Sequence, residues 1–281
     1  MNGKLLRSFL RSGTLEFAKD YADAARHTPN LSGRTTVPWA RGDGLPVHYR
    51  RGTSDLGLIY TILLKRDSAG EYWLPDGLPH QTIFDIGGNI GVTSRYLAHR
   101  FPGARIHTFE PVPANIEVLR DNTGGVPGIQ VHPYGLGAQN GSFTLQPNSS
   151  DRRNQGNFSL TAAGDGAGGV QVQVRAVPDV LREVGNPRVD IIKIDTEGAE
   201  WDILSAFPVD VLSRVSWIYG ELHTESIANP TAFKLLDYLS QWFVIDVHKP
   251  LHKQNFNFDA CNKSIASQFR SFRRRHSKAR F

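Results

Sequence analysis

A glycine-rich turn follows an apolar run in the stretch TIFDIGGNIG, residues 82–91. Gly87, Gly88 and Gly91 allow the backbone to bend sharply and to approach a ligand closely. A helix that starts after such a turn presents free N–H groups to an anion, either a phosphate or a carboxylate. The pattern matches neither the dinucleotide motif G-x-G-x-x-G nor the P-loop G-x-x-x-x-G-K-[ST]. Asp85, directly before the turn, would repel a pyrophosphate but suits a ligand that carries positive charge.

Glu110 supplies a second acidic position, because it follows Gly91 by 19 residues. An acidic residue roughly 20 positions after such a turn, at the end of the next strand, reaches the hydroxyls of a ribose. S-Adenosylmethionine combines a ribose with an ammonium, a carboxylate and a sulfonium. Asp85 would orient the ammonium, the turn would bind the carboxylate, and Glu110 would bind the ribose. The alternative is a strand, turn and helix that pack tightly and bind nothing.

Candidate catalytic residues follow two later apolar runs, VDIIKID and VSWIYGELH. Methyl transfer from a sulfonium to a hydroxyl requires an aligned acceptor and a group that takes the hydroxyl proton. Asp195 ends the first run, and His223 ends the second with an unperturbed pKa near 6.5, which suits a base. We assign both residues to catalysis, and Asp195 to the cofactor contacts as well. A structural role is the alternative for His223. Lys193 shares a strand face with Asp195 and would pair with it.

The same two runs carry further carboxyl groups. Glu221 lies two residues before His223, so both side chains project from one face of a strand. Asp195, Glu197 and Glu221 could hold Mg²⁺, which would orient and acidify a substrate diol. Solvated carboxylates are the favoured interpretation, so a metal is not expected. Glu200 would complement the N-terminus of the helix that follows this run.

Strands that alternate with helices must position these residues, and the pattern predicts a mostly parallel sheet with helices on both faces. Apolar runs without alternation, such as VDIIKID, are typical of strands that are buried on both sides. In an open α/β sheet the ligand binds outside the carboxyl ends of the strands. Asp85, Glu110, Asp195 and Glu221 fall at such ends, so we expect them around one crevice. IQVHPYGLG is expected as the third strand and FVIDVHK as the last.

An insertion separates two of the expected strands. SFTLQP and VQVQVRAV predict an antiparallel pair, which would form an inserted β-hairpin. The loop between them, Asn148–Gly169, is rich in Gly, Ser and Asn and is a candidate lid over the substrate. Arg152, Arg153 and Asn157 are its candidate contacts. A disordered hairpin tip is the alternative.

The chain is expected to divide into an N-terminal extension (1–45), a Rossmann-like domain (46–258) and a basic C-terminal tail (259–281). The extension is too small for a core of its own, although Leu5–Ala25 could form an amphipathic helix. The net charge is +5, and residues 270–281 contain six basic and no acidic residues. Such a tail is favoured as a solvated segment over an arm that binds nucleic acid.

The composition of the 281 residues sets further limits. Cys261 is the single cysteine, so no internal disulfide can form. No apolar run reaches the roughly 20 residues that span a bilayer. The N-terminal MNGKLLRSFLRSG is basic, but its apolar part is too short for a signal peptide. We therefore expect a cytoplasmic location, and the oligomeric state stays open.

Several of these motifs together resemble those of the FkbM-type methyltransferases. They are DIGGNIG, HTFEPVPANIEVLRDN, GLGAQNGSFTL, DIIKIDTEGAEWDIL and IYGELH, and RRGTSDLGLIYTILLKRDSAGEY ahead of them is also similar. The resemblance extends from about Tyr49 to about Val247. It implies a class I, Rossmann-like fold that binds S-adenosylmethionine. It also implies O-methylation of a hydroxyl on a sugar, a polyketide or another secondary metabolite, the commonest activity of the family.

The sequence departs from the family pattern at two places. The turn reads GGN where GAN is commoner, and GLGAQNG lacks an aspartate that often follows the third strand. Backbone groups of Leu136 and Gly137 are therefore our candidates for contacts with the adenine. The expected cofactor contacts are Asp85, Gly87, Gly88, Asn89, Gly91, Glu110, Pro111, Leu136, Gly137 and Asp195.

Three alternative functions stay open at this stage. They are N-methylation, modification of RNA through the basic tail, and a nicotinamide-dependent oxidation. The favoured partner is a small-molecule or glycan acceptor, with nucleic acid disfavoured because the body of the protein is nearly neutral.

Overall fold

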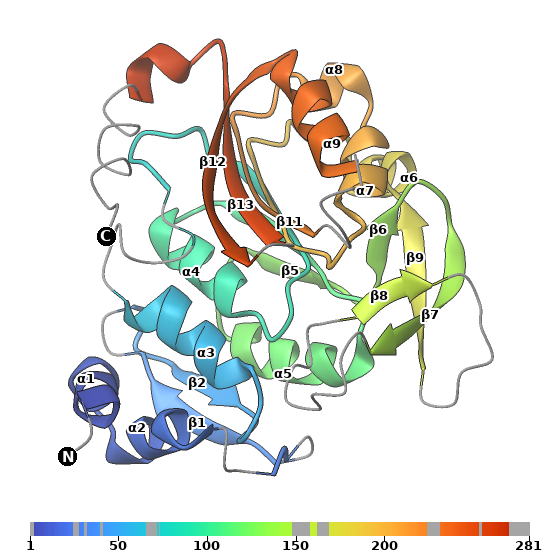
Figure 1. Cartoon of the computed structure of the whole chain (residues 1–281). Helices are drawn as coiled ribbons and strands as arrows, with labels where there is room; N and C mark the ends of the chain where they lie inside the picture. Colours follow the sequence, from blue (N-terminus) through green and yellow to red (C-terminus); the bar gives the residue numbers. More distant parts are fainter. Residues whose placement is uncertain are drawn as a thin grey trace.

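The computed structural model describes residues 3–24, 28–30, 33–39, 42–65, 72, 74–147, 158–161, 169–223, 231–252 and 255–269. Arg152, Arg153, Asn157 and the chain from residue 270 onward lie outside the described residues, so their expected roles stay predictions. Figure 1 shows a central sheet with helices on either side, a smaller sheet beside it, and the two N-terminal helices at the edge of the molecule.

A seven-stranded sheet forms the centre of the fold, in the order β12-β13-β11-β10-β3-β4-β5. The five strands from β11 to β5 in this order are parallel to one another, and β13 runs antiparallel between β11 and β12. The expectation of a mostly parallel sheet is therefore confirmed. The strands are β3 (Thr82–Ile86), β4 (Arg105–Phe109), β5 (Ile129–His132), β10 (Ile191–Ile194), β11 (Trp217–His223), β12 (Phe243–His252) and β13 (Asn255–Asn262).

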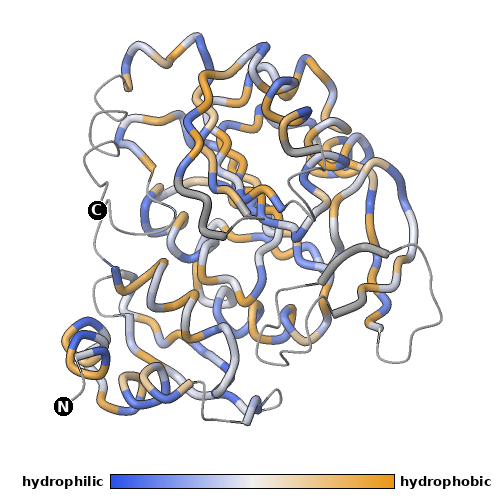
Figure 2. Tube along the Cα trace, viewed as in Figure 1, coloured by the Kyte–Doolittle hydropathy of each residue, from blue (hydrophilic) through white to orange (hydrophobic). Residues whose placement is uncertain are grey.

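The central strands send alternate side chains into two separate cores. Ile83 belongs to one buried cluster, and its neighbour Phe84 belongs to the other. Ile191 and Ile192 divide between the two clusters in the same way. Figure 2 shows hydrophobic residues concentrated along these strands. A strand with both sides buried needs an apolar residue at every position, which explains its continuous apolar sequence.

Helices cover both faces of the sheet (Figure 1). Leu97 and Val118, on α4 and α5, join the first cluster, whereas Leu204 and Leu235, on α7 and α9, join the second. None of the helices in the described part of the chain has both the length and the apolar character that a membrane crossing requires. The helices are α4 (Val92–Arg100), α5 (Pro113–Thr123), α6 (Val177–Glu183), α7 (Glu200–Ser205), α8 (Val209–Leu212) and α9 (Thr231–Ser240).

The inserted strands form a second, four-stranded sheet in the order β6-β9-β7-β8. β7 (Gly141–Pro147) and β9 (Val170–Ala176) pair antiparallel, as expected, and β8 (Phe158–Thr161) pairs with β7. IQVHPYGLG, which was expected as one strand, is instead divided between β5 and β6 (Gly135–Gly137) in different sheets. Pro133 lies between the two strands and cannot donate a hydrogen bond to a neighbouring strand, which favours a break there.

The expected end of the series at FVIDVHK is wrong, because β12 turns back into β13 and β13 inserts beside β11. The expected domain boundary after residue 258 falls inside β13, so the sheet continues to Asn262. A short 3₁₀ helix, η4 (Ala266–Phe269), follows, and Phe269 packs edge-on against Trp217 of β11. Trp217 is buried in the core.

The N-terminal segment packs onto the same core as the sheet. Two helices, α1 (Gly3–Ser12) and α2 (Leu15–Ala22), replace the single helix expected from residue 5 to 25, and Gly13 between them has a φ of 74°. Phe17 and Val37 are fully buried in the first cluster. The extension thus lacks a core of its own, as expected. β1 (Thr35–Pro38) pairs with β2 (Pro46–Tyr49), and α3 (Asp55–Leu58) continues into a π-helix, η2 (Ile59–Leu64).

Candidate cofactor and active site

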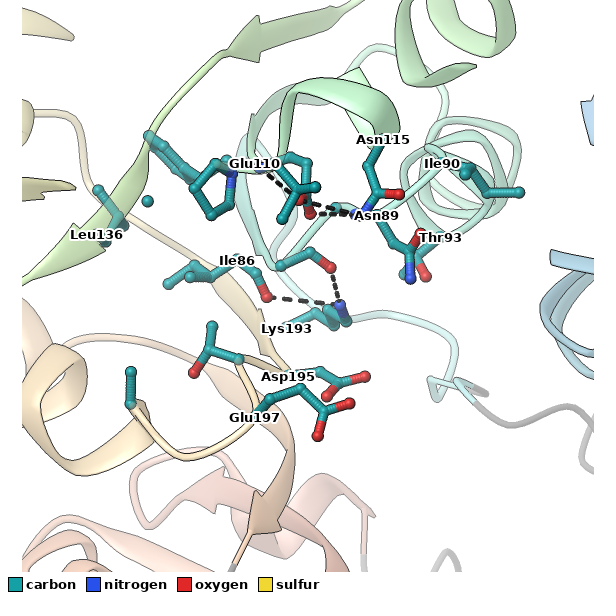
Figure 3. A pocket seen from close by; sticks show the side chains of 18 of the residues that line it. Ile86, Asn89, Ile90, Thr93, Glu110, Asn115, Leu136, Lys193, Asp195 and Glu197 are labelled. Carbon is teal, nitrogen blue, oxygen red and sulfur yellow. Dashed lines mark hydrogen bonds between the residues drawn. The ribbon is translucent and has the colours of Figure 1, made fainter. Parts of the chain in front are cut away.

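A crevice opens at the carboxyl ends of β3, β4, β10 and β11, where the sequence placed the polar residues. Figure 3 shows Asn89, Glu110 and Asn115 along one side of it, and Asp195 and Glu197 along the other. Seven of the expected cofactor residues line it: Gly87, Gly88, Asn89, Glu110, Pro111, Leu136 and Asp195.

The glycine turn fits its surroundings only without side chains at two positions. Gly87 has a φ of 81°, and a Cβ there would lie 1.9 Å from the backbone oxygen of Asp195. A Cβ on Gly88 would lie 2.3 Å from Cγ2 of Thr108. Asn89 then adopts a left-handed φ of 48°, and Gly91, with a φ of 81°, caps the start of α4. Gly91 therefore shapes the turn without lining the crevice.

Asp85 lies beneath the turn and not in the crevice, which changes its expected role. Its carboxylate is fully buried and accepts a hydrogen bond of 2.6 Å from the Ser94 hydroxyl. Lys193 Nζ lies 3.4 Å from Asp85 Oδ1 and donates to the Gly87 carbonyl at 2.6 Å. Burial raises the pKa of Asp85, even though the Lys193 ammonium opposes that rise. Asp85 and Lys193 thus hold the turn from below, whereas the sequence paired Lys193 with Asp195.

Glu110 lines the crevice, and most of the hydrogen-bonding positions of its carboxylate are occupied. Its Oε2 accepts from the Asn89 N–H at 2.8 Å, and its Oε1 accepts from the Val112 N–H at 2.9 Å and from Asn115 Nδ2 at 3.3 Å. Burial raises the pKa of this carboxyl, and these donors lower it in part. A carboxylate has about four lone-pair sites, so about one stays available for a hydroxyl of a bound ribose.

A buried arginine that the sequence did not indicate fixes the orientation of Asn115. Arg50 is fully buried and makes two 2.8 Å bonds to the Asp55 carboxylate. Its Nη2 also donates to Asn115 Oδ1 at 3.0 Å. Because that oxygen is occupied by a donor, the amide nitrogen of Asn115 must face Glu110. The N-terminal segment thereby supports the Glu110 side of the crevice.

Asn89 provides a direct sign that the crevice is built for a ligand. Its Oδ1 is buried and has no hydrogen-bond partner among the described residues. A buried acceptor without a partner is costly, by roughly 1–3 kcal/mol, unless a bound molecule supplies a donor. The crevice also presents the Glu110 carboxylate and an apolar wall that includes Leu136. Gly137 does not line the crevice, so Leu136 is the one of our two adenine candidates that the geometry retains.

Five titratable side chains gather at the other end of the crevice. His223 Nδ1 lies 3.1 Å from Glu200 Oε1, and its Nε2 lies 3.2 Å from Glu197 Oε2 and 3.5 Å from Glu221 Oε1. Asp195 Oδ1 is 4.0 Å from the same nitrogen. Glu221 and His223 therefore share a strand face, as expected.

Glu200 closes the turn between β10 and α7, as its position at the helix start suggested. Its Oε1 accepts from the N–H groups of Thr196 and Gly198, each at 3.1 Å. The same oxygen faces His223, so the turn and the strand are joined through one carboxylate. Glu197 lies within this turn with a left-handed φ of 56°, which is uncommon for a residue with a long side chain.

The carboxylates change the charge of His223. Burial alone would lower its pKa, but Glu200 and the other carboxylates outweigh that effect and raise the pKa of His223 to about 10. Burial and the nearby carboxylates raise the pKa of Glu197 to about 8, despite the attraction of His223. A pKa raised in this way favours the imidazolium, so His223 is less suited to accept a proton at neutral pH than the expected role of base requires. Asp195, which accepts from the Tyr72 hydroxyl at 3.2 Å, is the better placed acceptor.

Three side chains of this cluster lie close enough together to hold a metal ion. Asp195, Glu197 and His223 each offer a ligand atom, and these atoms lie within 4.8 Å of one another. Two carboxylates and an imidazole are ligands that Mg²⁺, Mn²⁺ or Zn²⁺ accepts. His223 here takes the place that the sequence gave to Glu221.

The parallel sheet with one antiparallel strand, and the crevice at its carboxyl edge, define a class I, Rossmann-like methyltransferase. The family model "Methyltransferase FkbM domain" matches residues 85–249. "Methyltransferase 1" of Beauveria bassiana is 32% identical over 186 residues, which cover 60% of this chain and 74% of that relative. The chain therefore belongs to the FkbM methyltransferase family, and it is an enzyme.

Two further proteins are similar to this chain. "2-O-methyltransferase NoeI" of Sinorhizobium fredii is 25% identical over 161 residues, which cover 53% of this chain and 66% of the relative. The crystal structure of "Methyltransferase FkbM" from Methylobacillus flagellatus is similar with a TM-score of 0.46 and 14% identity, over 89% of this chain and 60% of that one.

Proposed function

We propose that this enzyme transfers the methyl group of S-adenosylmethionine to a hydroxyl of a small-molecule or glycan acceptor. The family supports methyl transfer, and the relative named as a 2-O-methyltransferase supports oxygen as the acceptor atom. The observation that carries the proposal is the crevice itself. Its buried, unpartnered Asn89 oxygen and the Glu110 carboxylate lie on one side, and the carboxylates of Asp195 and Glu197 lie on the other.

Different residues of the crevice would bind the cofactor and accept the proton. The turn from Gly87 to Asn89 and the Glu110 carboxylate would hold the cofactor, which supplies an activated methyl group when bound. Asp195 would take the hydroxyl proton as the acceptor oxygen forms its bond to the methyl carbon and the carbon–sulfur bond breaks. The His223 imidazolium would keep the neighbouring carboxylates ionised and aligned.

Positioning contributes more than the base in this scheme. Holding the two reactants in line can contribute roughly 7–11 kcal/mol, whereas a placed base contributes about 10²- to 10⁴-fold in rate. Apolar side chains of Leu58 and Ile62 on one wall, and of Val172 and Val174 on another, line the same crevice. These walls would exclude water and orient the acceptor.

A divalent cation is a second arrangement of the same cluster, favoured by the 4.8 Å grouping of Asp195, Glu197 and His223. A bound cation would orient an acceptor diol and make its hydroxyl more acidic. Chelation separates the two arrangements. Activity that survives exhaustive chelation supports Asp195 as the direct proton acceptor, whereas loss that added Mg²⁺ or Mn²⁺ reverses supports the cation.

Two measurements test the main proposal. Calorimetry should show binding of S-adenosylmethionine and of S-adenosylhomocysteine, with no binding of NAD. Mass spectrometry of candidate sugars and hydroxylated metabolites, incubated with the enzyme and cofactor, should show a product heavier by one methylene. A product from an amine but from no hydroxylated acceptor, or binding of NAD alone, would overturn the proposal.

The cytoplasmic location stays a prediction. Fractionation of cells that express the tagged chain would check it, and recovery outside the cytoplasm would contradict it.

A further inference from the structure

Helix α1 buries its two serines and exposes three of its four large apolar side chains. Ser8 and Ser12 are 0% and 3% exposed, whereas Leu10 is 66% exposed. The Ser8 hydroxyl is satisfied within the helix, because it donates to the carbonyls of Lys4 at 2.8 Å or Leu5 at 3.0 Å. A surface helix normally places its apolar stripe against the core. The exposed apolar side chains of α1 therefore contribute little to the packing of the protein.

Exposed apolar side chains gather near the N-terminus, where Leu6, Phe9 and Leu10 share one face of α1. Leu6 and Phe9 of α1 are 41% and 37% exposed, and Leu15 at the start of α2 is 47% exposed. Together with Leu10 they make up what we call the N-terminal patch. They are four of the eight large apolar side chains exposed in the described part of the chain, although they fall within ten residues of sequence. Single exposed apolar residues are ordinary, but a cluster of them marks an interaction surface.

The charges around the patch are positive. α1 contains Lys4, Arg7 and Arg11 and no acidic residue. Lys4 Nζ lies 4.5 Å from the centre of the Tyr21 ring, and the Arg11 guanidinium lies 5.0 Å from that of Tyr60. These aromatic contacts hold two of the cations close to the body of the protein, beside the helix.

The two acidic residues of the neighbouring helix α2 are already paired with a cation outside α1. Arg51 forms salt bridges with both Glu16 and Asp20 of α2. Figure 1 shows α1 at the edge of the molecule, next to α2, with its outer side uncovered by any other labelled element. A partner that approaches α1 thus meets apolar side chains flanked by positive charge.

We propose that α1 docks on an anionic lipid surface. Leucine and phenylalanine on one side of a short helix, with lysine and arginine on another and no acid, are the features of a helix that lies in the membrane interface. The N-terminal patch enters the boundary between headgroups and acyl chains, and the positive charge beside the helix attracts the anionic headgroups. The binding is peripheral and reversible, since so short a helix buries little area. It is independent of the proposed chemistry in the crevice.

Vesicle binding by the full chain tests the proposal. The fraction of protein that sediments with mixed phosphatidylcholine–phosphatidylglycerol vesicles should exceed that with phosphatidylcholine alone. The double variant Leu6→Ser/Leu10→Ser should bind the mixed vesicles about tenfold more weakly or worse. Arg7→Gln/Arg11→Gln should weaken binding and reduce its sensitivity to salt. Val209→Ser/Phe233→Ser, which alters exposed apolar residues elsewhere, is the matched control and should bind like the wild type.

The following outcomes would overturn the proposal. Absence of wild-type binding to the anionic vesicles would do so, as would equal losses in the patch and control variants. A wild-type dimer that Leu6→Ser/Leu10→Ser converts to a monomer in analytical ultracentrifugation, without vesicle binding, would assign the patch to a second copy of the chain. Far-ultraviolet circular dichroism and the melting temperature establish that the variants are folded, and Leu10→Ser alone is the milder change if the double variant is not.

Discussion

We propose that His223 acts on its neighbours and not on the acceptor, because four carboxyl groups surround it. At neutral pH an imidazolium with a pKa of about 10 carries a positive charge that offsets the negative charge of Asp195, Glu200 and Glu221, whereas the pKa of about 8 favours the neutral form of Glu197. This charge balance is what permits a carboxylate to serve as proton acceptor at the crevice.

Replacement of His223 by Gln should therefore change how activity depends on pH. Without the imidazolium, the pKa of Glu197 and Glu200 rises, so the acid limb of the kcat profile should move to higher pH by about one unit or more. The affinity for S-adenosylmethionine should change less than kcat. The control is His248→Gln, which removes a histidine bonded to Asp259 away from the crevice. An acid limb that stays in place would contradict this role.

Glu110 should govern affinity for the cofactor and little else. Glu110→Gln places an amide where the carboxylate accepts from Asn89, Val112 and Asn115, so at least one donor would meet another donor. We expect the Kd for S-adenosylmethionine to rise roughly 10- to 100-fold, which corresponds to the loss of a hydrogen bond to a charged group. Calorimetry measures this directly. Glu117→Gln, on the exposed side of α5, should leave the Kd unchanged; equal losses in both variants would contradict the assignment.

At the scale of elements, the sequence predicts the strands that are buried on both sides and misses one that is not. Continuous apolar runs in the sequence predict β3 and β10. β13 alternates apolar residues with Asn257 and Asp259, and both polar side chains bond to partners that are distant in the sequence. Asn257 donates to the Tyr219 hydroxyl, and Asp259 accepts from Trp217 Nε1. Nothing near β13 in the sequence reveals those partners, so the sequence pattern does not predict a strand there.

The unusual GGN turn has a physical explanation in the neighbouring strand. A Cβ on Gly88 would meet Cγ2 of Thr108, on β4, at 2.3 Å. Gly88→Ala should therefore destabilise the protein by roughly 1–3 kcal/mol through overpacking. The double variant Gly88→Ala/Thr108→Ser removes the methyl group that clashes and keeps the hydroxyl that bonds Ser94.

A double-mutant cycle with urea unfolding measures the effect. The loss in the double variant should be smaller than the sum of the single losses by about 1 kcal/mol or more. Gly57→Ala, where a Cβ would meet nothing within 4 Å, is the control and should be neutral or stabilising. Additive losses would show that Thr108 is not the obstacle.

At the scale of the whole molecule, the sequence pattern predicts where the site residues lie in the sheet. It does not predict which of these residues contact one another. The sequence places Gly87, Glu110 and Asp195 at strand ends, and the sheet brings them to one crevice. It does not reveal that Lys193 would reach under the turn to Asp85, because that contact depends on β3 and β10 being neighbours in register. Arg50 is missed for the same reason, since its partner Asn115 is 65 residues away.

A chain of hydrogen bonds ties the edge of the sheet together and should make the stability of the whole protein sensitive to acid. His107 Nδ1 lies 3.0 Å from His132 Nε2 across β4 and β5, and the Tyr134 hydroxyl lies 3.1 Å from His132 Nδ1. Burial and the neighbouring His107 lower the pKa of His132 to about 4, and burial lowers that of His107 as well. Both rings are therefore neutral in the folded protein at pH 7.

Between pH of about 6.5 and about 4 the unfolded chain binds a proton at His132 that the folded protein does not. The free energy of unfolding therefore falls as the pH falls through this window, by up to roughly 3 kcal/mol from His132. His132→Gln should lose this part of the dependence, so its unfolding free energy at pH 5 should fall less, relative to pH 7, than that of the wild type. Urea denaturation at both pH values measures the difference, and His99→Gln controls for the loss of an exposed imidazole. A variant as acid-sensitive as the wild type would show that the pair does not couple folding to pH.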